Sequence, residues 1–308
     1  MATPPVVRVL VPSYRGADLL LDCLATVLAS EGVDARVLVV DDASGDGTVA
    51  ALRARHPEVE LLENERNLGF AATCNRGLAR LLEEGAGEVF LLNQDTRLAP
   101  TTLAELHAFL GAYPRAAAVG PKTYSFLRAL DGRERLIYAG AWRRWLPLRQ
   151  QIPGIERVET TPRRGAVEVD YIWGHGVLLR GDALREVGLF DTDYPMYYED
   201  LDLCRRLRTA GHELWCLQSA VMWHDQPDGA RSGRADDWRW ACKVRSVSVF
   251  HRKHYGALRA ALLTPLTILS EAWELLRTRR ARASAQLALA GLRHALGLAP
   301  ASVGRSAP

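Results

Sequence analysis

Short apolar runs alternate with amphipathic segments in the first third of the chain, and this alternation sharply limits the folds open to it. Strands are predicted at 6–11, 36–40, 59–62 and 88–92, and helices around 20–28, 48–55 and 71–83. Strands that alternate with helices join through right-handed crossovers, which place the helices on the faces of a sheet. The sequence therefore predicts an α/β fold with a Rossmann-like, mostly parallel central sheet flanked by helices.

Polar residues directly follow two of these strands. Asp41 and Asp42 come after the second strand, and Asn93-Gln94-Asp95 follows the strand at 88–92. Ligands of such sheets bind outside the carboxyl ends of the strands, so both groups are expected at the ligand-binding edge. Each also has a purely structural interpretation: the aspartates could cap the next helix together with Ser44, and Asn93–Asp95 could form an Asx turn.

A third acidic group begins another predicted helix. Glu199, Asp200 and Asp202 stand in its first turn, and its apolar side carries Leu203 and Leu207 at helical spacing. The arginines between and after these leucines are expected to face outward. Acidic residues in a first turn also complement the helix dipole, so this pattern alone does not establish a site.

Oxygen-bearing side chains at Asn93 and Asp95 would suit a hard cation such as Mg²⁺ or Mn²⁺. His224 follows a predicted strand at 213–217 and could be either a core residue or a metal ligand. As a ligand it would favour Mn²⁺, because imidazole is a softer donor than carboxylate. No group of residues has the spacing of a zinc site.

Charge is distributed unevenly along the 308 residues. Residues 229–308 hold 14 Lys and Arg against 4 Asp and Glu, whereas residues 1–228 hold 25 against 32. We therefore predict a catalytic or binding domain at 1–228 and a basic, helical C-terminal extension at 229–308. Such an extension favours an anionic membrane surface as partner, through arginines 277, 279, 280 and 282. The alternative is that its helices pack on the domain or in a homodimer. No nucleic-acid motif accompanies the charge, so nucleic acid is not expected to bind.

The cysteine pattern and the apolar pattern bear on the compartment. The five cysteines are scattered without a C-x-x-C pair, which is typical of reduced thiols in a cytosolic protein. The N-terminus lacks the pattern of a signal peptide, and no apolar run is long enough to span a membrane. The sequence predicts a cytoplasmic location, on the inner face of the plasma membrane if the extension binds lipid.

One segment favours a different class of enzyme. Residues 45–50 match G-x-G-x-x-A and Glu63 ends the next strand, as in dinucleotide-dependent oxidoreductases. The glycines do not directly follow the strand, however, and Asp41, Asp42 and Asp46 would repel a pyrophosphate. The oxidoreductase remains an alternative at this stage.

Taken together, the motifs resemble those of glycosyltransferase family 2, which has the GT-A fold, and most of all its rhamnosyltransferase-like branch. The resemblance runs from about residue 6 to residue 224. The matching segments are Val-Pro-Ser-Tyr at 11–14, 40–48, 67–71 with Asn75, Leu-Asn-Gln-Asp-Thr at 92–96, and 188–191 leading into 198–204.

The resemblance implies an inverting, metal-dependent transfer of a rhamnose-like or other hexose. The donor would be a nucleotide-diphosphate sugar, with dTDP or UDP favoured. The acceptor would be a hydroxyl of a glycan or polyprenyl-linked glycan in cell-envelope polysaccharide synthesis. Asp200 would be the catalytic base with Glu199 beside it, and Mn²⁺ or Mg²⁺ would bind Asp95 and His224. The nucleotide sugar would contact Pro12, Tyr14, Asp41, Asp42, Asn67, Gly69, Asn75, Asn93 and Gln94, and the acceptor would contact Trp173, Gly174, His175 and Asp202.

Two further classes compete with this interpretation. A non-catalytic sugar-nucleotide-binding scaffold on the same fold would be marked by loss of the base, but Asp200 is present. A nucleotidyltransferase would need a glycine-rich, basic loop near the N-terminus, and residues 11–16 do not form one.

Overall fold

The central sheet of the computed structural model begins with the four strands that the sequence predicts. β1 (Val6–Ser13) pairs in parallel with β2 (Asp34–Asp41) and with β4 (Glu88–Leu92), and β3 (Glu60–Glu63) continues the sheet beside β2. The intervening helices are α1 (Ala17–Leu28), α2 (Thr48–Arg55) and α3 (Phe70–Glu83). The structure describes residues 3–126, 134–143, 150–151, 157–159, 164–224, 233–277 and 281–295.

The second half of the sheet is mixed rather than parallel. β12 (Gly176–Arg180) lies antiparallel between β4 and β6 (Ala116–Ser125), and β13 (Glu213–His224) runs parallel to β6 but antiparallel to β5 (Thr96–Leu98). A parallel neighbour needs a long crossover, usually a helix. Among the described residues between β6 and β12 only short strands occur, so β12 is free to return antiparallel. These are β7 (Arg135–Tyr138), β8 (Trp142–Arg143), β9 (Gln150–Gln151), β10 (Arg157–Val158) and β11 (Ala166–Glu168).

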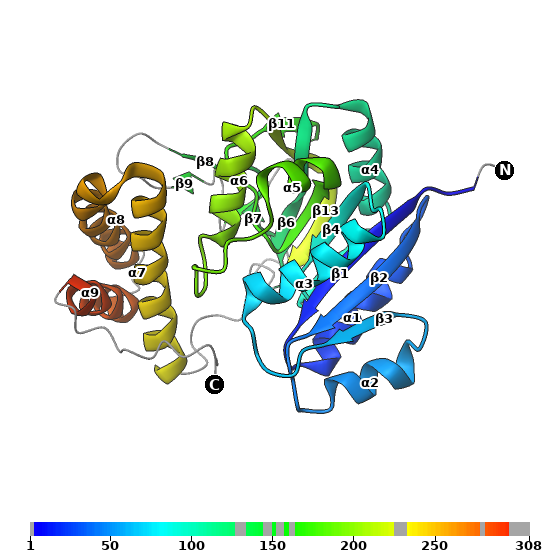
Figure 1. Ribbon diagram of the computed structural model, residues 1–308, viewed down its shortest axis with the longest axis horizontal. Coiled ribbons are helices and arrows are strands. Elements are labelled where there is room, and N and C mark those ends of the chain that lie inside the picture. Colours follow the sequence, from blue (N-terminus) through cyan, green and yellow to red (C-terminus); the bar gives the residue numbers. More distant parts are fainter. Residues whose placement is uncertain are drawn as a thin grey trace.

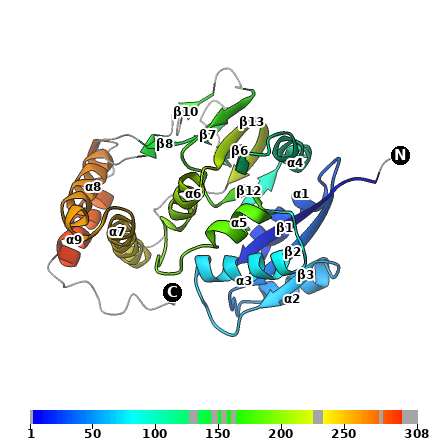
Figure 2. The same cartoon turned by 45° about the horizontal axis from the view of Figure 1, so that its top comes forward.

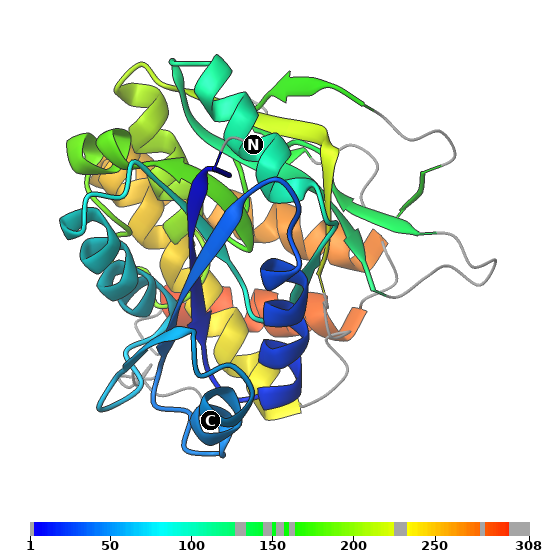
Figure 3. The same ribbon diagram turned by 90° about the vertical axis from the view of Figure 1, so that its right-hand side faces the viewer.

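Helices cover both faces of the sheet. Val9 and its alternate neighbours on β1 pack against α1 and α4 (Thr102–Ala112), whereas Leu10 points to the opposite face, where α3, α5 (Gly181–Val187) and α6 (Glu199–Thr209) lie. Figure 3 shows α1 and α3 on opposite sides of β1. On the α3 side the approach is close: a Cβ atom on Gly77 would lie only 2.2 Å from Cδ1 of Leu10.

Three helices of the C-terminal region stand together at one end of the molecule (Figure 1). They are α7 (Gly233–Tyr255), α8 (Ala257–Arg277) and α9 (Ala281–Ala295). Val244, Ile268, Ala272 and Leu287 form their shared apolar cluster, while Phe250 of α7 belongs to the core of the sheet. Figures 1 and 2 both show α7 between α6 and the α8–α9 pair. The predicted domain boundary at 228/229 lies outside the described residues.

The apolar content of these helices is not that of a membrane span. Over the part of the chain that the structure describes, no helix is both long enough and apolar enough to cross a bilayer.

Candidate active site

The topology of the sheet collects distant segments at the carboxyl end of β4. β12 pairs Gly176 with Leu92, so the residues just before β12 lie beside those just after β4. The N–H of Asn93 accordingly donates to the carbonyl oxygen of His175 at 3.0 Å. The pairing of β13 with β5 sets His224 opposite Thr96. Residues predicted as metal ligands and as acceptor contacts thus meet at one sheet edge.

The two predicted metal ligands are neighbours. His224 Nε2 lies 3.2 Å from Asp95 Oδ1, and the ring of His224 stacks on that of His175 with centroids 4.6 Å apart. His175 Nε2 is 3.1 Å from the hydroxyl of Thr123. Burial, with the nearby His224, lowers the pKa of His175 well below its ordinary value, so His175 is a neutral imidazole.

A divalent cation fits this pair of donors. Two ligands at right angles around a Mg²⁺-sized ion, each about 2.1 Å from it, lie about 3 Å apart, which is close to the observed separation. Asn93 Oδ1 and His224 Nδ1 are buried without a hydrogen-bond partner in the described structure. These two polar atoms are therefore available to bind a water molecule or a ligand. No cluster of three or more His, Cys, Asp or Glu occurs among the described residues. An ion here would therefore complete its shell with water or with phosphate oxygens.

Asp200, in the first turn of α6, is a carboxylate held by three donors. Its Oδ2 accepts a hydrogen bond from the hydroxyl of Tyr171 at 2.7 Å and from the N–H of Gly174 at 3.1 Å. Its Oδ1 accepts from the N–H of Leu201 at 2.8 Å. Burial raises the pKa of Asp200 above its ordinary value, and these three hydrogen bonds oppose that rise because they stabilise the ionised form.

Glu199 has the opposite environment. Its side chain is buried, and its Oε2 has no hydrogen-bond partner in the described structure. Burial and the adjacent charge of Asp200 raise the pKa of Glu199 to about 8. Two neighbouring carboxyl groups whose surroundings differ in this way divide one proton unequally. At neutral pH we assign the proton to Glu199 and the negative charge to Asp200.

The turn that leads into these two residues is strained and is held from outside. Tyr197 and Tyr198 have φ values of 66° and 70°, a conformation that costs energy for residues with a side chain. The hydroxyl of Ser246 on α7 donates to the carbonyl oxygen of Met196 at 2.8 Å, and the ring of Tyr198 packs edge-on against Phe250. Helix α7 therefore helps to set the direction in which Glu199 and Asp200 leave the turn.

The carboxylate of Asp202, which the sequence analysis predicted to contact the acceptor, is bonded by residues of α6, of α7 and of the loop before α6. The carboxylate is 2.7 Å from His254 Nε2, 2.7 Å from Arg206 Nε and 3.2 Å from the hydroxyl of Tyr194. Burial alone would raise the pKa of Asp202, but the hydrogen bonds from His254 and Arg206 outweigh it and hold the pKa below its ordinary value. We therefore assign Asp202 to the junction of α6 with α7. Arg206, expected to face outward, instead also donates to backbone carbonyls at the end of α5.

The aspartate pair after β2 builds the loops on the donor side. Asp41 bonds the hydroxyl of Ser44 and accepts the Ser44 N–H at 2.9 Å, which is the structural arrangement considered for this pair. Asp42 accepts the N–H groups of Leu68 at 2.7 Å and Gly69 at 3.0 Å. Both carboxylates are buried. Their direct contact with a nucleotide remains a prediction, whereas the structure shows that the Asp42 carboxylate holds the 64–69 loop and the Asp41 carboxylate holds Ser44.

Two residues predicted to contact the nucleotide sugar, Asn75 and Gln94, link distant segments of the chain through hydrogen bonds to the backbone. The side-chain amide of Asn75 donates to the carbonyl oxygen of Phe190 at 2.7 Å, and its oxygen accepts the Phe190 N–H at 2.9 Å. Gln94 accepts the N–H of Tyr14 at 3.0 Å and donates to the carbonyl oxygen of Arg15. Because both ends of the Asn75 amide are occupied by the backbone, we assign it a positioning role rather than a ligand contact.

The remaining predicted residues surround the same edge. Pro12 is buried in β1, and Tyr14 and Asn67 are half-buried in the loops that follow β1 and β3. Trp173 packs against the rings of Tyr138, at 5.5 Å, and His175, at 5.2 Å. Gly174 faces Asp200, and a Cβ atom there would lie in ordinary van der Waals contact with Cβ of Asp200, at 3.5 Å.

Three residues of the site escaped sequence reasoning, namely Tyr171, Thr123 and His254. Each contacts a predicted residue across a separation of 29 to 52 positions, and none belongs to a recognisable motif. Only Tyr171 could have been found from the sequence, because it lies next to the predicted acceptor contacts Trp173 and Gly174.

Comparison with known proteins identifies the family. A sequence model described as glycosyl transferase family 2 matches residues 8–187. The chain is a member of glycosyltransferase family 2. It is also 31% identical, over 84% of its length and 87% of the relative's, to an N-acetylglucosaminyl-diphospho-decaprenol L-rhamnosyltransferase of Mycobacterium tuberculosis. A pre-mycofactocin glycosyltransferase of that organism is 30% identical over 62% of the chain and 37% of its own length.

Solved structures of glycosyltransferases share the fold of this family member. The mannosyltransferase PcManGT from Pyrobaculum calidifontis, in complex with GDP-Man and Mn²⁺, has a TM-score of 0.59 at 19% identity, covering 96% of this chain and 88% of its own. GalNAc-T7 with UDP, GalNAc and Mn²⁺ has a TM-score of 0.58 at 14% identity, covering 82% of this chain and 50% of that one. The predicted α/β fold of the GT-A type is confirmed.

The glycosyltransferase assignment replaces the oxidoreductase alternative, and local geometry agrees. Asp46 Oδ1 accepts the N–H of Thr48 at 3.1 Å at the start of α2. A carboxylate therefore occupies the position that a pyrophosphate would take at that helix N-terminus.

Proposed function

We propose that this glycosyltransferase transfers a hexose, rhamnose or a similar sugar, with inversion from a nucleotide-diphosphate sugar to a hydroxyl of a glycan acceptor. The observation that carries the proposal is the position of Asp200. This half-buried carboxylate accepts three hydrogen bonds, which favour its ionised form. Gly174, one of its donors, is followed by His175, which lies at the sheet edge that holds Asp95 and His224.

The proposed chemistry uses Asp200 as the general base. An acceptor hydroxyl would give its proton to this carboxylate as the oxygen attacks the anomeric carbon. Glu199 stays protonated beside it, which keeps the negative charge on the residue that must take up the proton. Tyr171 and Gly174 hold the carboxylate in one orientation. A divalent ion held by Asp95 and His224 would neutralise the leaving diphosphate.

For the donor we propose a dTDP- or UDP-sugar. Support comes from the mycobacterial relative, which is an L-rhamnosyltransferase, and from the UDP bound to GalNAc-T7. PcManGT holds GDP-Man instead, so proteins with this fold bind more than one base, and the donor panel includes GDP-sugars. Both solved structures also contain Mn²⁺, which supports a divalent ion of that kind for this chain.

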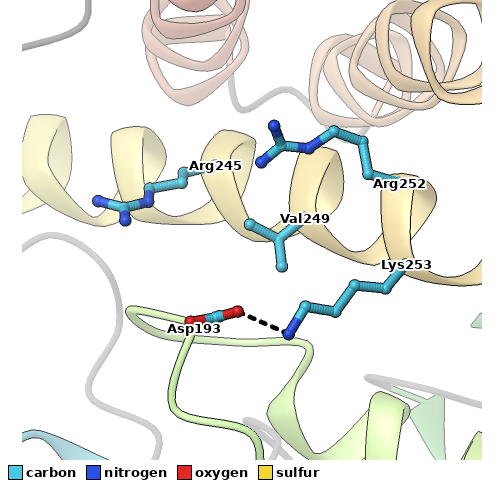
Figure 4. A pocket seen from close by; sticks show the side chains of 5 residues that line it. All are labelled: Asp193, Arg245, Val249, Arg252 and Lys253. Carbon is cyan, nitrogen blue, oxygen red and sulfur yellow. Dashed lines mark ion pairs between the residues drawn. The ribbon is translucent and has the colours of Figure 1, made fainter. Parts of the chain in front are cut away.

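For the acceptor we propose a polyprenyl-linked glycan that carries a diphosphate, in the synthesis of a cell-envelope polysaccharide. A pocket of about 320 Å³ lies between α7 and the loop before α6 (Figure 4). In it Lys253 pairs with Asp191 and Asp193, while Arg245 and Arg252 have no ion-pair partner among the described residues. Two guanidinium groups that make no ion pair with the described residues, beside the loop before α6, are suited to bind a diphosphate.

The same proposal places the enzyme at the cytoplasmic face of the plasma membrane, because a polyprenyl chain resides in lipid. The side chains of the arginines predicted to bind that surface, at 277, 279, 280 and 282, lie outside the described structure. A homodimer likewise remains a prediction.

The test compares two neighbouring isosteric amides. Asp200→Asn should abolish nucleoside-diphosphate release from a panel of dTDP-, UDP- and GDP-sugars in the presence of acceptor and Mn²⁺, yet leave donor binding by calorimetry intact. Glu199→Gln, which copies the protonated acid, should keep measurable turnover. Full turnover in Asp200→Asn would overturn the assignment of the base. Donor binding without release by the wild-type protein would favour the non-catalytic scaffold.

A further inference from the structure

Helix α8 exposes a continuous apolar stripe. Six of the thirteen large apolar side chains that are exposed in the described residues lie on it at intervals of three or four positions, which is the spacing of one helix face. The stripe is about 27 Å long at 1.5 Å per residue. Its members, with their exposed fractions, are Leu258 (89%), Leu262 (64%), Leu266 (46%), Leu269 (61%), Trp273 (67%) and Leu276 (49%).

Among the described residues of α8, the outward side carries more large apolar side chains than the inward side, where Ala260, Ile268 and Ala272 are the buried apolar residues. The inward side also includes Thr264 and Thr267, both buried, and the Thr264 hydroxyl is 3.0 Å from His251 Nδ1 on α7. Hydroxyl groups therefore face the protein while leucines face outward. Helix α8 also lies on the outer side of α7 in Figures 1 and 2, so the helices of the described structure do not cover the stripe from the catalytic side.

We propose that this stripe inserts into the surface of an anionic lipid bilayer, with α8 lying in the plane of the interface. An interfacial helix of this kind buries its apolar face at the level of the headgroups, and a tryptophan such as Trp273 is suited to that depth. Arg259 is the exposed charge among the described side chains of α8, whereas Glu271 is paired with Lys243 at 2.6 Å. The face thus presents leucines and positive charge to its partner.

Charge distinguishes a bilayer from a second copy of the chain as the occupant of this surface. Residues 229–308 carry 14 basic against 4 acidic residues. Two copies meeting through α8 would bring two such regions together and repel each other, whereas anionic headgroups attract each basic residue near the surface. Of the two occupants, the bilayer is the one whose charge complements the stripe.

This inference is independent of the proposed reaction, since vesicle binding is measured without donor or acceptor. Purified full-length protein is floated with vesicles of phosphatidylcholine, with and without phosphatidylglycerol. The variant L262Q/L269Q removes two members of the stripe without adding charge. The matched control L19Q/L28Q changes two exposed leucines on α1, at the far side of the sheet.

The wild type and the control should float with the anionic vesicles, and L262Q/L269Q should lose on the order of tenfold or more in partitioning. As a second measurement, the variant Leu262→Cys is labelled with an environment-sensitive fluorophore. The five native cysteines are buried, so the label enters at the new position. Brominated lipids should quench it.

Three results would overturn the proposal. The wild type could fail to float, the L262Q/L269Q variant could float as well as the wild type, or the label could remain unquenched. If instead the wild type were a dimer by light scattering and L262Q/L269Q a monomer, the stripe would belong to a second copy.

Discussion

Replacing Glu199 with glutamine should stabilise the fold at neutral pH, because glutamine removes a carboxyl group that the folded protein keeps protonated. Its pKa rises from an ordinary 4.5 to about 8 on folding. Because the pKa of Glu199 is higher in the folded than in the unfolded protein, the free energy of unfolding is greatest in acid. It falls as the pH rises from the pKa of the unfolded state toward that of the folded state. The loss is about 1 kcal/mol at about pH 5 and about 4 kcal/mol at about pH 7.5, from about 1.4 kcal/mol per pH unit.

The prediction concerns the pH dependence of the difference between two proteins, so it is measured by urea unfolding of wild type and Glu199→Gln at several pH values. The variant should gain about 3 kcal/mol relative to the wild type between about pH 5 and pH 7.5. Glu65→Gln, at an exposed position, is the matched control and should give a flat difference. A constant difference for Glu199→Gln, or a variant that becomes relatively less stable as the pH rises, would refute the assignment of the proton to Glu199.

Three other predictions follow from contacts of the described residues. Gly77→Ala should lower the free energy of unfolding by about 1–3 kcal/mol, measured by urea titration, because the added Cβ would lie 2.2 Å from Leu10 Cδ1. Asp202→Asn should destabilise the protein above about pH 4 and lose this effect in stronger acid, because a lowered pKa gives stability that disappears as the pH falls through the folded value; thermal unfolding at several pH values measures it. His224→Ala should raise the Mn²⁺ concentration needed for half-maximal nucleotide release by at least about tenfold, and an unchanged titration would argue against metal ligation at Asp95 and His224.

Sequence patterns predicted the first half of the fold well because its contacts are local. Each strand from β1 to β3 is followed by a turn and a helix, so the helix predicted at 48–55, for example, coincides with α2. The second half depends on pairings between distant strands. β6 is a run that begins with three alanines, which lacks the bulk typical of a strand, and it was not predicted. The antiparallel course of β12 was missed because nothing in its own sequence records which strands lie beside it.

The candidate site shows the same division. The positions of Asn93, Asp95 and Asp200 follow from motifs at the ends of elements, and the structure brings them to one region of the molecule. What could not be predicted is which polar groups are already occupied. Asn75 looks in sequence like a ligand residue, yet both ends of its amide bind the backbone of Phe190, 115 positions away. Sequence patterns thus selected residues that the structure brings close together. They did not distinguish polar groups that remain available to a ligand from those that bind the backbone of neighbouring segments.

Helix α7 connects Glu199 and Asp200, the proposed catalytic pair, to the rest of the basic C-terminal extension. On one side Ser246 and His254 bind Met196 and Asp202, which flank Glu199 and Asp200. On the other side α7 packs against α8, the helix that carries the apolar stripe. Two consecutive residues with positive φ cannot hold their turn without such support. The extension therefore contributes to the architecture of the candidate site, and any partner bound to α8 lies one helix layer, about 8–10 Å between axes, from the helix that supports the turn before the proposed base.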